Sequence, residues 1–303
     1  MKKAALPEIP LEAWRSTKDT LHLFCQIVGK IRLSLHPRLN HWWHVPLYVT
    51  PLGLSTRTIP YDDGNFEIEF DLCSHKIVIR TNSGRTEDFA LYDGLCVADF
   101  YDGLIANLAK LGIKAHINTA PYEAPSKTPF PEDRANCSYD SSFVEKFHQT
   151  LVAVDDIFEE FRGRFIGKST PVHMFWHSFD LALTRFSGKL APVRDGANRV
   201  EREAYSHEVI SFGFWFGDDN VPAPAFYSYT VPEPDGLANE KLLSTEASWQ
   251  DSNGSHMALL MYDDVRTSDD PRKMVLDFLE SAYQAGAKTA GWNVREFALS
   301  PLA

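Results

Sequence analysis

Histidines beside aromatic residues are the side chains in this sequence best suited to carry out chemistry. His41 and His44 belong to one aromatic segment, and His173 and His177 belong to a second. Neutral imidazole binds zinc or ferrous iron, and histidine is the usual acid–base group near neutral pH. In an extended strand, however, His173 and His177 stand about 13 Å apart, and His41 and His44 point to opposite faces. Neither pair can therefore hold an ion by itself.

A metal site must combine histidines from different segments. We predict His44, His173 and His207 as candidate zinc or iron ligands, with Glu208 as a further ligand or a general base. The alternative is that each histidine is hydrogen-bonded in the core or lies exposed at the end of a strand. Ser206, His207 and Glu208 cannot act as a triad in an extended chain, because adjacent side chains point to opposite faces.

Asp180 and Arg185 lie in an otherwise apolar segment, residues 179–186. A charge in such a strand costs free energy unless it is paired or hydrogen-bonded. Arg185 is therefore expected either to bind a carboxylate or phosphate group of a substrate, or to form an ion pair with a neighbouring strand. Together with His207 and Glu208, these two residues form the predicted catalytic set.

The elements that must position these residues occur twice along the chain. Apolar residues three and four positions apart predict a long amphipathic helix over 21–35 and another over 143–165. Each helix is followed by one of the aromatic–histidine segments, 41–50 or 173–181. Both segments are rich in aromatic and other apolar residues, and both are predicted to be strands.

Further strands and a closing helix follow in each half. Strands are expected over 66–73 and 76–80 in the first half, and over 205–216 and 225–231 in the second. Each half then ends with a similar tripeptide and a helix, which are Leu91–Asp93 with 97–111 and Met261–Asp263 with 271–282.

These matching landmarks, in the same order, predict an α+β fold made of two diverged copies of a helix–antiparallel sheet–helix unit. A pseudo-twofold axis is expected to relate the copies. A loop over 121–131 holds four prolines and separates them. The predicted units are residues 1–125 and residues 126–303, the second with longer insertions, and together they are expected to form one compact body.

Composition restricts the class of partner. The 303 residues carry a net charge of -11 at pH 7, and no dense cluster of Lys and Arg is present. Neither nucleic acid nor an anionic membrane surface is therefore an expected partner. No apolar run of about eighteen residues predicts a membrane span. The four cysteines are scattered without a CxxC pair, which predicts free thiols and a cytoplasmic location.

Four distinctive phrases cover residues 26–30, 40–44, 179–188 and 202–208. At these phrases the chain resembles a bacterial family catalogued as domain of unknown function 5996, over nearly the whole length from about Leu11 to Trp292. The resemblance implies one compact architecture and brings no established activity. The family pattern has a small residue where His177 stands, which argues against His177 as an essential ligand. The polar positions that match the family are His41, His44, His173, Asp180, Arg185, His207 and Glu208.

The leading hypothesis is an enzyme that acts on a small polar molecule at a histidine-centred site between the two repeats. Zinc and iron are the candidate cofactors, and a metal-dependent hydrolase or oxygenase is one form of the hypothesis. The alternative is a non-catalytic module that binds a small molecule or a protein in an aromatic cavity. The aromatic content of 13% suits such a cavity. GxGxxG, phosphate-loop, GxSxG and HExxH motifs are absent from the sequence, so nucleotide-dependent enzymes, serine hydrolases and zincins lose support.

Overall fold

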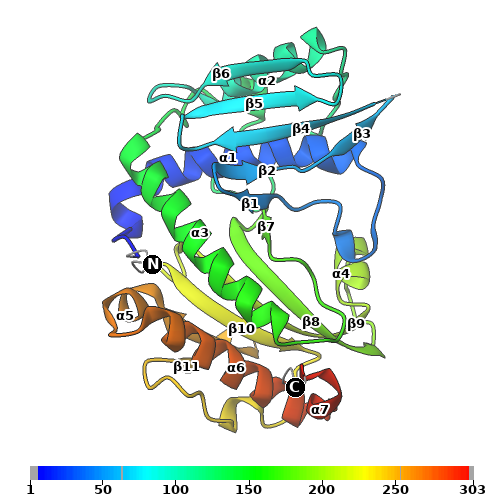
Figure 1. The fold of residues 1–303 in the computed structure, drawn as a ribbon, viewed down its shortest axis with the longest axis vertical. Coiled ribbons are helices and arrows are strands. Elements are labelled where there is room, and N and C mark those ends of the chain that lie inside the picture. The colour runs from blue at the N-terminus through cyan, green and yellow to red at the C-terminus, as the bar shows by residue number, and fades with distance from the viewer. Residues whose placement is uncertain (1–5, 63, 253, 300–303) are drawn as a thin grey trace.

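The computed structural model describes residues 6–62, 64–252 and 254–299. These residues form helices and two six-stranded antiparallel sheets, so the predicted α+β class is confirmed. Figure 1 shows the two sheets toward opposite ends of the molecule, with α3 (Ser141–Gly163) passing from one to the other.

The first half opens with α1 (Leu11–Leu35) and the short helix η1 (Asn40–Trp42), and it closes with α2 (Val97–Lys110). Its sheet has the strand order β1-β2-β4-β5-β6, with β3 paired to β4. The strands are β1 (Tyr48–Thr50), β2 (Gly53–Ser55), β3 (Ile59–Tyr61), β4 (Gly64–Asp71), β5 (Lys76–Thr81) and β6 (Thr86–Ala90).

The second half opens with α3, and its sheet has the strand order β11-β12-β10-β9-β8-β7. The strands are β7 (His173–Phe175), β8 (Asp180–Leu190), β9 (His207–Trp215), β10 (Ala225–Val231), β11 (Ser248–Ser252) and β12 (Ser255–Met261). The remaining helices are η2 (Phe130–Glu132), α4 (Arg199–Ala204), η3 (Leu237–Asn239), α5 (Tyr262–Thr267), α6 (Pro271–Thr289) and α7 (Val294–Phe297). Each half thus runs from helix through antiparallel sheet to helix, and their relation by a pseudo-twofold axis stays a prediction.

The two sheets meet at a short antiparallel bridge. The backbone N–H of Leu47 donates to the carbonyl of Met174 at 2.9 Å, and the N–H of Met174 donates to the carbonyl of Leu47 at 2.8 Å. Beside this bridge, the indole N–H of Trp176 donates to the carbonyl of Val45 at 3.1 Å. Gly29 of α1 allows this placement, because a Cβ there would lie 2.1 Å from the Trp176 ring. The bridge therefore fixes the turn that leads into β8.

The aromatic–histidine segments are the places where the strand prediction is wrong. His41 and Trp42 lie in η1 with positive φ angles of 53° and 61°, so the first segment is extended only at β1. In the second segment, β7 ends at Phe175 and a turn follows, in which Phe179 has a φ of 58°. Turns built from bulky residues at positive φ have no glycine to mark them.

The prediction of four free thiols is wrong for two of the cysteines. Cys96 and Cys137 form a disulfide that joins the start of α2 to the segment before α3. Cys25 and Cys73 are free. Among the described residues, no helix is long and apolar enough to cross a membrane.

Candidate functional site

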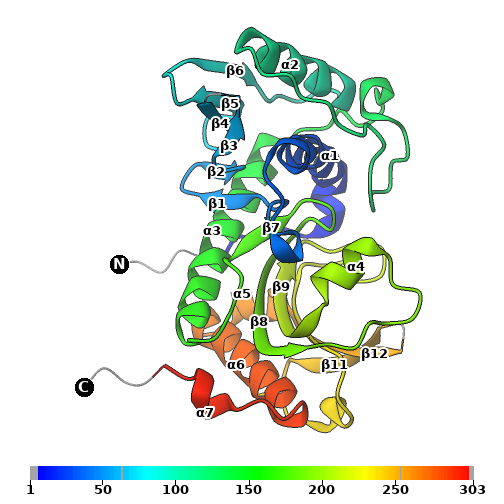
Figure 2. The same cartoon turned by 90° about the vertical axis from the view of Figure 1, so that its right-hand side faces the viewer.

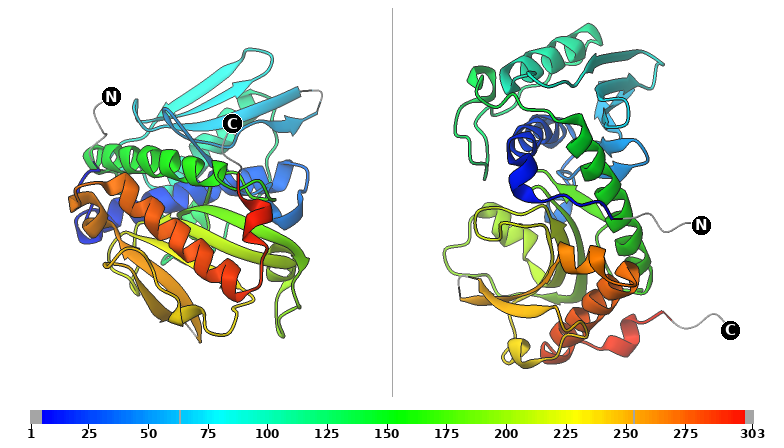
Figure 3. Two further views of the ribbon diagram at one scale, coloured as in Figure 1. Left: turned by 60° about the horizontal axis from the view of Figure 1, so that its bottom comes forward. Right: turned by 90° about the vertical axis from the view of Figure 1, so that its left-hand side faces the viewer.

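The second sheet has one face covered by helices and one face open to a cavity. α3 and α6 lie side by side over the covered face (Figure 3). The open face bounds a cavity of about 1260 Å³, and α4 lies on this side, opposite α3 and α6 (Figure 2). Residues 41–43 and 116–118 add to the wall.

The pleat of β8 decides which of its residues reach the cavity. Side chains alternate between the two faces along a strand. Asp180, Ala182 and Thr184 line the cavity. Between them, Leu181 and Leu183 are fully buried in the hydrophobic core on the other face.

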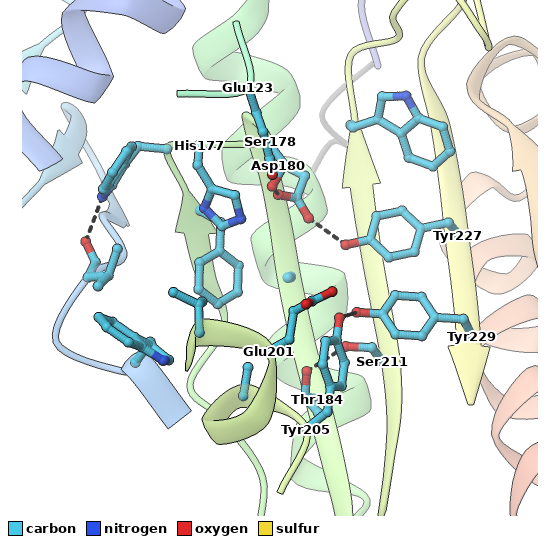
Figure 4. A pocket seen from close by; sticks show the side chains of 18 of the residues that line it. Glu123, His177, Ser178, Asp180, Thr184, Glu201, Tyr205, Ser211, Tyr227 and Tyr229 are labelled. Carbon is cyan, nitrogen blue, oxygen red and sulfur yellow. Dashed lines mark hydrogen bonds between the residues drawn. The ribbon is translucent and has the colours of Figure 1, made fainter. Parts of the chain in front are cut away.

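Asp180 is the buried acidic residue of the cavity. Its carboxylate accepts hydrogen bonds from the hydroxyls of Ser178 and Tyr227 (Figure 4). Asp180 is only 6% exposed, and burial raises the pKa of its carboxyl although both hydrogen bonds act in the opposite direction. No ion pair with Asp180 is formed among the described residues; the cationic influence on its pKa comes from the imidazole of His177, which also lines the cavity.

Tyr227 reaches Asp180 by lying across the middle strand. The register places Gly213 of β9 between Ala182 of β8 and Tyr227 of β10. A Cβ at Gly213 would lie 2.2 Å from both Cζ and Oη of Tyr227. The missing side chain at this position, with the small methyl of Ala182 beside it, therefore makes room for the Tyr227 ring.

A second group of hydroxyls lies next to the Asp180–Tyr227 pair. The hydroxyls of Thr184 and Ser211 are 2.6 Å apart, and those of Tyr205 and Tyr229 are 3.1 Å apart (Figure 4). Burial raises the pKa of both tyrosines, so these hydroxyls remain protonated near neutral pH. Each pair can donate to or accept from a polar group of a ligand.

Sequence comparison places the chain in a family. Residues 6–299 match the family of unknown function DUF5996. The chain belongs to the DUF5996 family. No curated protein and no solved structure matches the chain. Any function of this DUF5996 protein must therefore be argued from the cavity itself.

The histidines of the DUF5996 chain do not form the predicted metal site. His44 accepts a hydrogen bond from the N–H of Leu39 at 3.2 Å and does not line the cavity. His173 is fully buried, and neither ring nitrogen has a hydrogen-bond partner among the described residues. Burial, together with the charge of Arg57, lowers the pKa of His173 to about 3. No group of three or more His, Cys, Asp or Glu side chains in the described part of the chain could hold a metal ion, so His44, His173 and His207 do not come together.

His41 is the other predicted residue that lines the cavity. Its Nε2 lies 3.2 Å from the ammonium of Lys168, and its Nδ1 lies 3.3 Å from the carbonyl of Ala204. Burial, followed by the charge of Lys168, lowers the pKa of His41. His207 lies beside it, with the two ring centroids 5.3 Å apart, but does not line the cavity.

Arg185 and Glu208 lie away from the cavity that holds Asp180. Arg185 is 1% exposed, and its guanidinium carbon lies 3.7 Å from the centroid of the Phe161 ring of α3. Glu208 has one carboxylate oxygen that is buried without a hydrogen-bond partner among the described residues. Of the predicted catalytic set, only Asp180 lies in the cavity.

Sequence reasoning missed the tyrosines of β10 and the glycine that accommodates them. The signal was present in 226–229, where Tyr227 and Tyr229 alternate with Phe226 and Ser228. That alternation predicts one face that carries both tyrosines. The alternation cannot identify Asp180 as the hydrogen-bond partner of Tyr227, because Asp180 lies 47 residues earlier in the sequence.

Proposed function

We propose that this DUF5996 protein binds a small molecule in the cavity on the open face of its second sheet, with Asp180 as the polar anchor. The observation that supports the proposal is a buried carboxyl that has two hydroxyl partners and, in the part of the chain that the structure describes, no ion pair. It lies in a cavity of about 1260 Å³. Ligand sites commonly have volumes of roughly 300–1,000 Å³. The cavity can therefore hold a small organic molecule together with some water.

The chemistry of the lining supports the same proposal. Small-molecule sites are mostly apolar and aromatic, with a few polar groups that orient the ligand. Here Trp215, Phe175 and Met257 supply apolar surface. Asp180 and the Thr184–Ser211 hydroxyls supply polar groups at one side.

The proposal can be tested with Nile red, a neutral dye whose fluorescence rises in apolar surroundings. We expect saturable binding of one dye per chain, and loss of that binding in Leu259→Trp, which adds a bulky ring from β12 into the cavity. Leu190→Trp is the matched control, because Leu190 is 76% exposed and lies outside the cavity. Absence of saturable binding to the wild type, or equal binding in Leu259→Trp, would contradict the proposal.

Catalysis at the same place is the second candidate function. The observation that favours it is Asp180, because a carboxyl with a raised pKa inside a cavity can exchange a proton with a bound molecule. This version retains the hypothesis of an enzyme acting on a small molecule but moves the acid–base role from the histidines to Asp180. Turnover that disappears in Asp180→Asn while Nile red still binds would favour the enzyme over the binding module.

A further inference from the structure

The charges around the cavity have one predominant sign. Asp180 and five further carboxylates line it, namely Glu123, Glu201, Asp218, Glu246 and Asp251. In the described lining, Lys30 is the one lysine, and no arginine is present. Arg194, from outside the lining, forms an ion pair with Glu201 alone among these acids. The cavity therefore has a negative potential, in keeping with the net charge of -11 of the whole chain.

Lys30 directs its ammonium group toward backbone carbonyls of a neighbouring loop. Its ammonium donates to the carbonyl of Asn118 at 3.0 Å and also to the carbonyl of Ala120. It also lies 5.1 Å from the centroid of the Phe130 ring. Burial lowers the pKa of Lys30 to about 8. Two of its three N–H donors are thus used by the loop between α2 and α3.

Aromatic rings whose faces can attract a positively charged group lie near Asp180. Trp215 and Tyr227 have ring centroids 5.1 Å apart, and Tyr227 and Tyr229 lie nearly parallel with centroids 6.0 Å apart. Aromatic faces attract cations, and the attraction increases when water is excluded. Phe175 and Trp43 add further rings to the lining.

We infer that the ligand of this cavity is an organic cation: a protonated amine or quaternary ammonium group on an apolar or aromatic body. The ammonium group pairs with Asp180, and the body packs against Trp215 and Tyr227. An anionic ligand would meet six acidic side chains, and a neutral one would leave Asp180 with its two hydroxyl partners and no ion pair among the described residues. The inference rests on the proposed function, since it names the class of molecule that the cavity binds.

Displacement of Nile red by three related indoles tests the inference. Tryptamine, tryptophol and indole-3-propionate share one ring and a two-carbon chain, which ends in an ammonium, a hydroxyl and a carboxylate group respectively. We expect tryptamine to displace the dye at a concentration about tenfold below tryptophol, with indole-3-propionate weakest. Equal or better displacement by the alcohol or the acid, or no displacement by tryptamine, would overturn the inference.

Asp180→Asn locates the charge that selects the cation. This variant keeps the shape of the side chain and removes its charge, so we expect loss of the tenfold preference for tryptamine, measured as the ratio of the concentrations of tryptophol and tryptamine that displace half of the dye from the same variant. Asp156→Asn is the matched control, because Asp156 is exposed on α3, outside the cavity lining, and the preference should persist there. A preference that persists in Asp180→Asn would overturn the pairing of the ammonium with Asp180.

The two proposals fail in different ways. If Nile red binds, is excluded by Leu259→Trp and shows no preference among the indoles, the cavity is a binding site and only the cationic class is wrong. If Nile red does not bind saturably, the proposed function itself is wrong, and the inference that rests on it falls with it.

Discussion

Asp180 and Arg185 lie five residues apart on β8, and both are buried charges in an apolar strand, but the strand directs them to opposite faces. Asp180 meets the cavity, where two hydroxyls donate hydrogen bonds to it and no described residue forms an ion pair with it. Arg185 faces the covered side, where its guanidinium Nη2 donates to the carbonyl of Phe161 at 2.5 Å. Burial of a charge is therefore common to both residues and identifies neither as functional.

The surroundings of Arg185 are those of a structural cation. Besides Phe161, the rings of Phe165 and Tyr283 lie with centroids 4.9 Å and 4.5 Å from its guanidinium carbon. Burial lowers the pKa of Arg185 to about 10, so the side chain is still charged near neutral pH. The charge is held by ring faces and one carbonyl inside the core, and Arg185 does not line the cavity that holds Asp180. A buried charge points to function when it adjoins a cavity, as Asp180 does.

The largest effect expected from this comparison is a loss of stability when Arg185 is replaced. Arg185→Ala should lower the free energy of unfolding by about 3 kcal/mol, because it leaves a cavity among three aromatic rings and removes one of two hydrogen bonds to the Phe161 carbonyl, the other coming from the N–H of Arg164. Arg185→Met retains most of the volume and should lose less. Urea unfolding measures both changes, and the folded fraction should bind Nile red with unchanged affinity. A variant of normal stability that no longer binds the dye would instead assign Arg185 to the ligand site.

The two faces of the sheet can also be compared with a matched pair of glycines. Gly213 faces the cavity beneath Tyr227, and Gly286 of α6 packs on the covered face against Thr230 and Ile210. An added methyl should cost about 1–3 kcal/mol of stability at either position, because overpacking displaces neighbouring atoms. Gly213→Ala should in addition weaken Nile red binding, since it displaces the Tyr227 ring, which lines the cavity.

Urea unfolding and dye titration of both glycine variants give the required measurements. Gly286→Ala should bind the dye normally once its lower stability is allowed for. If both variants lose binding to the same extent, the cavity does not depend on the Gly213–Tyr227 contact in particular.

The helices and the central strands of each sheet follow from local patterns, and this part of the fold was predictable. The apolar period of 143–165 and the alternation of 225–231 correspond to α3 and β10. The turns at His41 and Phe179 were not predictable, because bulky residues at positive φ resemble strand residues in sequence. The two turns lie on either side of the bridge between the sheets, in segments that are far apart in the sequence.

The candidate site was predictable only in part, for a related reason. Asp180 was predicted as a site residue because it is a charge in an apolar strand, and the same reason applied equally to Arg185. Both faces of β8 carry apolar residues, such as Ala182 and Leu183, so the sequence does not reveal which face is covered. That distinction arises from the packing of α3 and α6 on one side. The histidines were predicted as metal ligands from residue type, and residue type does not determine which side chains come together in the fold.

The smallest expected effect is the pH dependence that Asp180 contributes to stability. Its pKa is raised on folding, so the folded state binds the proton more tightly than the unfolded state. This contribution is fully present below the unfolded pKa of about 3.9 and is lost as the pH rises through the folded pKa. Asp180→Asn removes the titrating group. The stability difference, wild type minus variant, should therefore fall as the pH rises above about 4.

A second carboxyl changes stability in the same direction and has to be separated from Asp180. Burial, followed by the charges of Glu159 and Asp156, raises the pKa of Asp155 on α3 to about 7. Because Asp155 is present in both the wild type and Asp180→Asn, its contribution cancels in their difference. Asp155→Asn should flatten the wild-type curve between the unfolded pKa and about 7 while leaving the Asp180 difference intact. Urea unfolding across this range measures both, and a difference that rises with pH would mean that folding stabilises the charged form of Asp180, as a cation beside it would.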